Sequence, residues 1–269
     1  MPRAAFRPAF RPVSPPVSRP ALLLVAHGSR DPRHAATMGA LTARVRRLLP
    51  GVRAEAGYLD FDTPSVDGAL GRLYAAGARE VITVPLLLSR AFHAKTDIPA
   101  ALEEARAARP GLVVRQSDVL GPHPLLVAAL ERRLREAGLT PGTAPRTGVV
   151  LASAGSSDPE AIAVIAEIAR EWRHTGRWCA VRPAFASATT PTTADAVRAL
   201  HADGIRRVAV APYVLAPGRL PDRIAAGAHE AGADVLAPAL GAGPEVARLV
   251  VERYAAAVVS APQLSGAAA

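Results

Sequence analysis

Residues 21–32 read ALLLVAHGSRDP. Six apolar residues suit a buried strand, and the polar turn after them leads into an amphipathic segment over roughly 33–49. The alternation continues through strand candidates at 52–59, 81–88 and 112–116 and helix candidates at 64–76, 98–108 and 124–137. Such an order predicts an α/β fold in which helices cover both faces of a parallel sheet.

The same pattern recurs 127 positions later in the chain. AHGSRDP resembles SAGSSDP, YLDFDTP resembles FASATTP, and VPLLL resembles APYVL, which pairs Pro32 with Pro159, Pro64 with Pro191 and Pro85 with Pro212. Several anchors at one offset indicate an internal duplication. We therefore expect two similar flavodoxin-like halves with a cleft between them, at residues 21–140 and 147–259, joined by the turn-rich stretch 138–146.

The duplicate provides a comparison for residues that could carry chemistry. His27 corresponds to Ala154, Asp60 to Ser187 and His93 to Leu220. A single histidine is more often a helix cap or a surface residue than a ligand. Because all three ligand-capable side chains are replaced together, the pattern favours one working site in the first half.

The expected strand order places these residues near one another. In a flavodoxin-like order 2-1-3-4, ligands bind beyond the carboxyl ends of the strands, where the order reverses. His27 follows the first strand, His93 follows the third, and Asp60 closes the second. Two imidazoles and a carboxylate suit a divalent ion such as Fe²⁺, Co²⁺ or Ni²⁺. Ser29, Arg30, Arg90 and Lys95 surround the same crevice and are candidates for binding an acidic ligand.

Other residues and motifs carry less information. His123 begins a predicted helix and suits a helix-entry role at least as well as a pocket role, and the remaining histidines, at 34, 174, 201 and 229, are expected on helix surfaces. The chain contains no GxxxxGK[ST], no GxGxxG after the first strand and no GxSxG. The HGSR turn is similar to that of phosphohistidine enzymes, but those carry arginine before the histidine, where this chain has Ala26.

Composition narrows the class of partner and compartment. The formal charge of the 269-residue chain is +9, of which Arg3, Arg7, Arg11 and Arg19 contribute +4, so about +5 remains for the fold. This balance suits an acidic small molecule and does not indicate nucleic acid. The single cysteine, Cys179, and the lack of a membrane-length apolar run favour a cytoplasmic protein. The Arg/Pro-rich residues 1–20 and the tail 260–269 are expected to be disordered.

The three conspicuous stretches LLLVAHGSRDP, YLDFDTPSV and VPLLLSRAFHAKTDIP resemble the signatures of the long, internally duplicated sirohydrochlorin chelatases, over roughly residues 21–258. The resemblance implies ATP-independent insertion of a divalent metal into sirohydrochlorin, a lyase-type reaction. Iron would give sirohaem, and cobalt would give a precursor of cobalamin. No tightly bound cofactor is implied, because the metal is a substrate.

The resemblance also implies roles for particular residues. His27 stands where the family has its proton-accepting and metal-binding histidine, and His93 where it has the second metal histidine. Asp60 replaces the usual glutamate, which leaves open whether it binds metal or substrate. The segment of Leu88, Ser89, Arg90, Ala91 and Phe92 resembles the substrate-contacting segment.

Three alternatives remain open at this stage. The physiological metal is expected to be Fe²⁺, with Co²⁺ as the alternative, and a non-catalytic metal or tetrapyrrole carrier is a further possibility. A phosphohistidine-type hydrolase is the least favoured. Because the duplication supplies both halves within one chain, we expect a monomer.

Overall fold

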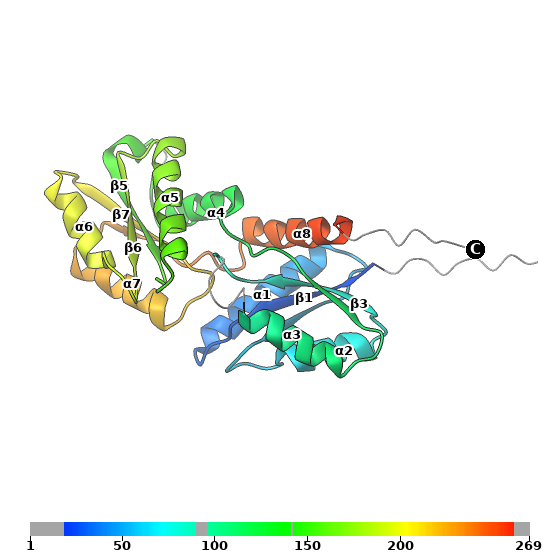
Figure 1. Cartoon of the computed structure of the whole chain (residues 1–269). Helices are drawn as coiled ribbons and strands as arrows, with labels where there is room; N and C mark the ends of the chain where they lie inside the picture. Colours follow the sequence, from blue (N-terminus) through cyan, green and yellow to red (C-terminus); the bar gives the residue numbers. More distant parts are fainter. Residues whose placement is uncertain (1–18, 90–95, 141, 261–269) are drawn as a thin grey trace, which may run out of the picture.

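A computed structural model of the protein describes residues 19–89, 96–140 and 142–260. It contains two four-stranded parallel sheets flanked by helices (Figure 1). The first half comprises β1 Ala21–Ala26, α1 Pro32–Leu48, β2 Ala54–Tyr58, α2 Val66–Ala75, β3 Glu80–Pro85, α3 Ile98–Ala107, β4 Val113–Gln116 and α4 Pro124–Glu136. After a short 3₁₀ turn at Ala144–Arg146, the second half comprises β5 Thr147–Ser153, α5 Pro159–Thr175, β6 Ala180–Phe185, α6 Thr193–Ala202, β7 Arg207–Tyr213, α7 Arg219–Glu230, β8 Val235–Leu236 and α8 Pro244–Val259.

The strand orders confirm the predicted fold class. The first sheet has the order β2-β1-β3-β4 and the second β6-β5-β7-β8, so the order reverses beside the first strand of each half. The register repeats as well: Leu22 pairs with Ile82, and 127 positions later Val149 pairs with Ala209. The duplication seen in the sequence is therefore a duplication of backbone structure.

Every residue of β1 is buried, which explains its unbroken apolar sequence. Alternate side chains of this strand point to opposite faces of the sheet. Leu23 and Val25 pack with α2 and α3 in one apolar cluster, whereas Leu22 and Leu24 belong to the cluster on the other face, which includes α1.

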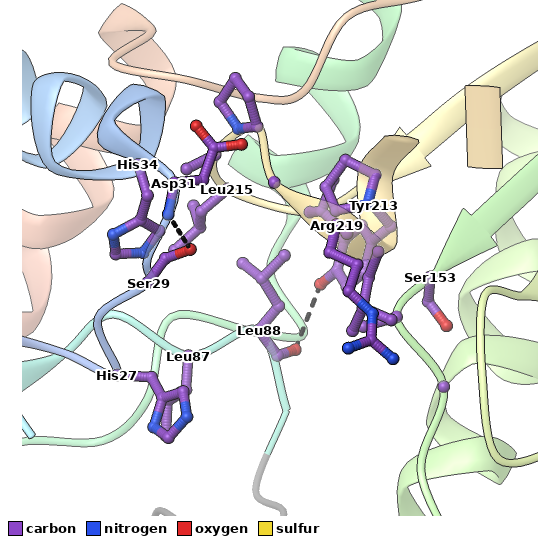
Figure 2. A pocket seen from close by; sticks show the side chains of 18 of the residues that line it. His27, Ser29, Asp31, His34, Leu87, Leu88, Ser153, Tyr213, Leu215 and Arg219 are labelled. Carbon is purple, nitrogen blue, oxygen red and sulfur yellow. Dashed lines mark hydrogen bonds between the residues drawn. The ribbon is translucent and has the colours of Figure 1, made fainter. Parts of the chain in front are cut away.

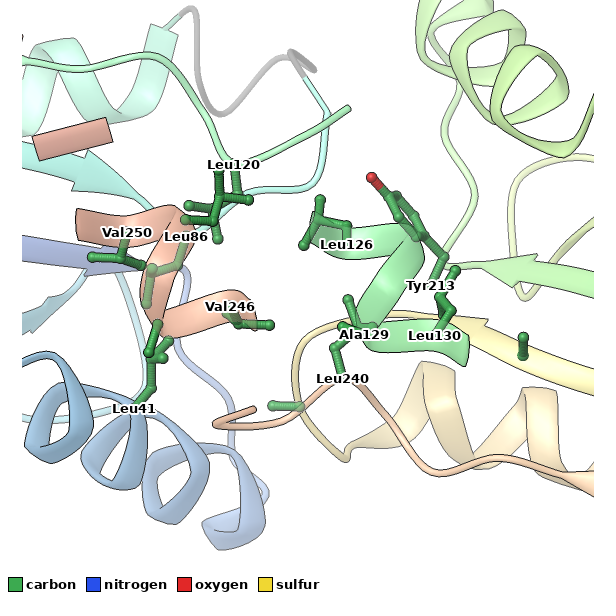
Figure 3. Packing of buried hydrophobic residues seen from close by; sticks show 14 of the residues in the cluster. Leu41, Leu86, Leu120, Leu126, Ala129, Leu130, Tyr213, Leu240, Val246 and Val250 are labelled. Atoms are coloured by element: carbon green, nitrogen blue, oxygen red, sulfur yellow. The ribbon is translucent and has the colours of Figure 1, made fainter. Parts of the chain in front are cut away.

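The last helix of each half packs against the opposite half. Helix α8 lies on α1 and β3 of the first half, whereas α4 lies on β7 of the second half and also touches α8 (Figure 1). In Figure 3, Val246 and Val250 of α8 lie beside Leu41 and Leu86, and Leu130 of α4 lies beside Tyr213. Each half is thus completed by a helix from the other repeat. This exchange of α4 and α8 could not be predicted from the boundary expected at 138–146.

Polar contacts accompany the exchanged helices. Arg132 on α4 forms an ion pair with Glu245 on α8 at 3.0 Å. The Tyr254 hydroxyl on α8 donates to the Pro20 carbonyl at 2.6 Å, just before β1. The two halves therefore share one continuous apolar cluster. The Tyr254–Pro20 hydrogen bond also links the last helix to the start of the first strand.

Within the described residues, no helix combines the length and the apolar character needed to cross a membrane. The predicted disordered segments at 1–20 and 260–269 lie outside the described residues except for Arg19, Pro20 and Ser260.

Candidate functional site

A cavity of about 1520 Å³ lies between the two halves and is lined by residues from both. The carboxyl ends of β1, β3, β5 and β7 meet at this cavity. In each sheet the cavity therefore lies beyond the pair of strands at which the strand order reverses. Its wall from the first half contains the turn that follows β1 and residues 86–89 after β3 (Figure 2). Strand β3 ends at Pro85, before the predicted limit of residue 88, and the residues after it become cavity wall.

His27 lies at the first position of the turn after β1 and lines the cavity. Its side chain is exposed, and its ring stands edge-on to Phe61 with centroids 6.2 Å apart. Gly28 follows with φ of +96°, and a Cβ at this position would lie 1.8 Å from the Asp60 carbonyl oxygen. The turn thus approaches the end of β2 more closely than any side chain at residue 28 would permit.

Asp62 stabilises the turn that contains His27 through a hydrogen bond. Its carboxylate accepts the Ser29 N–H at 3.0 Å and lies 3.4 Å from Nδ1 of His34. His34 is mostly buried and lines the cavity, so the expectation that it is a surface residue was wrong. The nearby Tyr58 hydroxyl has a pKa raised by burial and, secondarily, by the Asp62 charge.

Asp60 lies beside His27, although its carboxylate does not line the cavity. Its backbone N–H donates to the His27 carbonyl at 2.9 Å, and its side chain is exposed and accepts the Phe61 N–H at 2.8 Å. Asp60 was predicted from the sequence as a site residue, and Asp62 was not. The signal was present in the YLDFDTP stretch, where the second aspartate is two positions further on.

The remaining predicted site residues divide into two groups. Ser29, Arg30, Leu88 and Ser89 line the cavity, and their role in substrate binding stays a prediction. The other five, Arg90, Ala91, Phe92, His93 and Lys95, lie outside the described residues. Among residues 19–89, 96–140 and 142–260, no three His, Cys, Asp or Glu side chains are grouped to hold a metal ion, so the set of His27, His93 and Asp60 stays a prediction.

The second half builds the opposite wall from the corresponding turn. Gly155 has φ of +89°, and a Cβ there would lie 2.0 Å from the Ser187 carbonyl oxygen, as at Gly28. The backbone of the turn is therefore retained, whereas Ala154 stands in the place of His27. Tyr213 lines this wall as well, and its hydroxyl donates to the Leu88 carbonyl at 3.4 Å across the cavity (Figure 2).

His123 has the helix-entry role that the sequence allowed. It is the N-cap residue of α4, and its Nδ1 accepts the Leu125 N–H at 3.2 Å. It is absent from the cavity wall. Burial, with a further contribution from Arg253, lowers the pKa of His123, so the neutral ring that the cap requires is favoured.

The fold and cavity define a class: a two-lobed, internally repeated α/β protein with a ligand cleft at the strand ends of both lobes. The CbiX family model matches residues 21–137 and 148–257. The chain therefore belongs to the CbiX family.

Curated relatives of this chain carry chelatase names. It is 29% identical over 205 residues to a sirohydrochlorin cobaltochelatase of Priestia megaterium, covering 76% of this chain and 67% of that protein. It is 28% identical over 204 residues to a sirohydrochlorin ferrochelatase of the same organism, covering 76% of each. Among solved structures, SirB from Bacillus subtilis with Fe³⁺ matches with a TM-score of 0.78 and 25% identity, covering 89% of this chain and 96% of that one.

Proposed function

We propose that the protein inserts a divalent metal ion into sirohydrochlorin. The observation that carries the proposal is a histidine, His27, at the carboxyl end of β1 in a cavity of about 1520 Å³ that both halves line. Sites for ordinary small ligands occupy roughly 300–1,000 Å³, so this one suits a large macrocycle. The sirohydrochlorin chelatase names of relatives in two metal classes support the same substrate.

The chemistry requires a group that accepts protons beside the incoming ion. Insertion removes two pyrrole N–H protons while the ion loses bound water. A histidine titrates near pH 6.5, so a neutral imidazole is available near neutral pH both to hold the ion and to accept a proton. We assign this role to His27, and the second metal-binding role to His93 on the basis of its sequence. General-base assistance of this kind is worth roughly 10²–10⁴ in rate.

We propose Fe²⁺ as the physiological substrate. Two ferrochelatase relatives, from Priestia megaterium and Bacillus subtilis, match over 76% and 77% of their own lengths. Co²⁺ is the second candidate, because imidazole ligands accept both ions and intrinsic affinity rises from Fe²⁺ to Co²⁺. We further propose that one chain is the functional unit, since its two halves supply both walls of the cavity.

The test is anaerobic absorbance of the purified protein with sirohydrochlorin and Fe²⁺ or Co²⁺. The wild type is expected to convert the spectrum to that of the metallated product faster than the spontaneous reaction. His27→Ala is expected to lose at least about 10²-fold in rate, because it removes the proposed proton acceptor. His174→Ala is the matched control, since His174 is exposed and absent from the cavity wall.

The outcomes separate the alternatives. The ratio of the two initial rates ranks the metals. A wild type that binds sirohydrochlorin tightly but does not accelerate insertion would favour a carrier, and a His27→Ala variant as active as His174→Ala would remove His27 from the mechanism.

A further inference from the structure

The cavity wall of the second half carries two positively charged side chains. Arg219 and Arg223 lie in the first turns of α7 and line the cavity, whereas the described wall of the first half contributes Arg30 alone among arginines. Residues four apart lie on the same face of a helix, so the two guanidinium groups are neighbours on one surface. Figure 2 shows Arg219 and His27 on opposite sides of Leu88.

The acidic side chains that line the cavity bind a different arginine. Asp31 and Asp222 both line the cavity, but both bind Arg33, at 2.5 and 2.6 Å. Arg30 stacks over the Phe61 ring at 5.1 Å. Within the described part of the chain, neither Arg219 nor Arg223 has an ion-pair partner.

The start of α7 also lies close to the turn that carries His27. A Cβ on Gly218, which precedes Arg219, would lie 3.9 Å from Oγ of Ser29. The ion pair between Arg33 on α1 and Asp222 on α7 joins the two helices across the cleft. A ligand at His27 would therefore have its edge near the first turn of α7.

The repeat shows how this wall differs from that of the first half. Leu220 is the counterpart of His93 and lines the cavity between the two arginines in sequence. The second half has kept the turn geometry and lost the histidines. Its wall is consequently cationic and apolar, which suits binding of an anionic ligand more than proton transfer.

Resting on the proposed function, we propose that Arg219 and Arg223 bind carboxylate side chains of the tetrapyrrole and orient it over His27. Sirohydrochlorin carries many carboxylates on its rim, and guanidinium groups bind carboxylates through paired, charge-assisted hydrogen bonds. The second half then acts as the substrate-orienting wall, and the first half as the reacting one.

The experiment compares Arg219→Gln, Arg223→Gln and the double variant in the full chain. Metal-free sirohydrochlorin is titrated into each protein, and binding is followed by absorbance. Each single variant is expected to bind about tenfold more weakly or worse, and to raise KM by a larger factor than it lowers kcat, because His27 is intact. The salt dependence of binding is expected to become shallower, a change that a purely structural defect would not produce.

Arg206→Gln is the matched control. It makes the same charge change in the same half, but Arg206 is exposed, precedes β7 at the far end of the sheet, and is absent from the cavity wall. Arg219→Lys should restore part of the affinity and its salt dependence, because it restores the charge. If Arg219→Gln and Arg223→Gln bind as tightly as Arg206→Gln while the wild type metallates, this inference alone fails. A wild type that neither binds nor metallates sirohydrochlorin overturns the proposed function as well.

Discussion

Gly28 and Gly155 hold the same backbone position in the two halves, with φ of +96° and +89°. At both positions a Cβ would overlap a carbonyl oxygen at the end of the neighbouring strand, at 1.8 Å from Asp60 and 2.0 Å from Ser187. This close approach of the turn to the neighbouring strand fixes the position of the side chain that precedes each glycine. That side chain is His27 in the first half and Ala154 in the second.

We predict that Gly28→Ala and Gly155→Ala both destabilise the protein, by about 1–3 kcal/mol each, through positive φ and steric overlap. Only Gly28→Ala should also greatly reduce the chelation rate per folded molecule, because it displaces His27. Urea unfolding gives the stabilities, and initial rates under conditions where both variants are folded give the second comparison. Equal rate losses in the two variants would show that the position of residue 27 is not what matters.

The site residues that were predictable from the sequence have a counterpart in the repeat, whereas those that were not predictable depend on contacts between distant parts of the chain. His27 and its counterpart Ala154 could be compared directly, because the duplication supplies an internal reference. Asp62 and His34 act through a contact between residues distant in sequence, at 3.4 Å, and no local pattern encodes such a contact. Arg219 and Arg223 look like ordinary solvated helix charges until the cleft between the halves is known.

At the scale of single elements, α4 begins with an unusual cap. His123 Nδ1 accepts the Leu125 N–H at 3.2 Å, so this nitrogen must be unprotonated, and its Nε2 lies 3.6 Å from Glu252. Burial and Arg253 lower the pKa of His123 below 6.5, against the opposing effect of Glu252. The unfolded chain therefore binds a proton at higher pH than the folded chain does.

From this sign we predict that the His123 cap contributes stability above pH 6.5, which is lost as the pH falls through the lowered folded-state pKa. His123→Asn should keep an N-cap acceptor without a titrating group, and so show a smaller loss of stability between about pH 7 and about pH 5. Urea denaturation of both proteins at the two pH values measures the difference. An identical loss in the two proteins would mean that other groups account for the acid sensitivity.

Element types and order were predictable because apolar runs and helical periodicity are local properties of the chain. The strand order β2-β1-β3-β4 followed from the fold class, and the helix from residue 98 was expected where Ile98–Ala107 is found. Strand β3 stopped earlier than its apolar run, because the leucines after Pro85 serve two purposes: Leu86 packs in the core, and Leu86–Leu88 also form cavity wall. An apolar residue facing a ligand cannot be distinguished from one in a sheet by sequence alone.

At the scale of the whole molecule, the exchange of α4 and α8 makes the two halves interdependent. An amphipathic helix requires an apolar surface, and its sequence does not specify which of two similar sheets provides it. Leu130 on α4 is fully buried, lies beside Tyr213 in Figure 3 and belongs to the same apolar cluster as Leu240 of the second half. The cleft between the halves is therefore built on a shared core, and its two walls are held in a fixed relation.

This arrangement predicts that Leu130→Ala, a change in the first repeat, weakens the second half. The cavity left behind should cost about 2–5 kcal/mol. In hydrogen exchange, amides of β5 and β7 should lose more protection than those of β1 and β3, because α4 covers the second sheet. Arg135→Ala, an exposed change on the same helix, should alter stability by no more than about 0.5 kcal/mol. Greater loss of protection in β1 and β3 would mean that α4 supports its own repeat, and the two walls of the cleft would then be free to move as separate units.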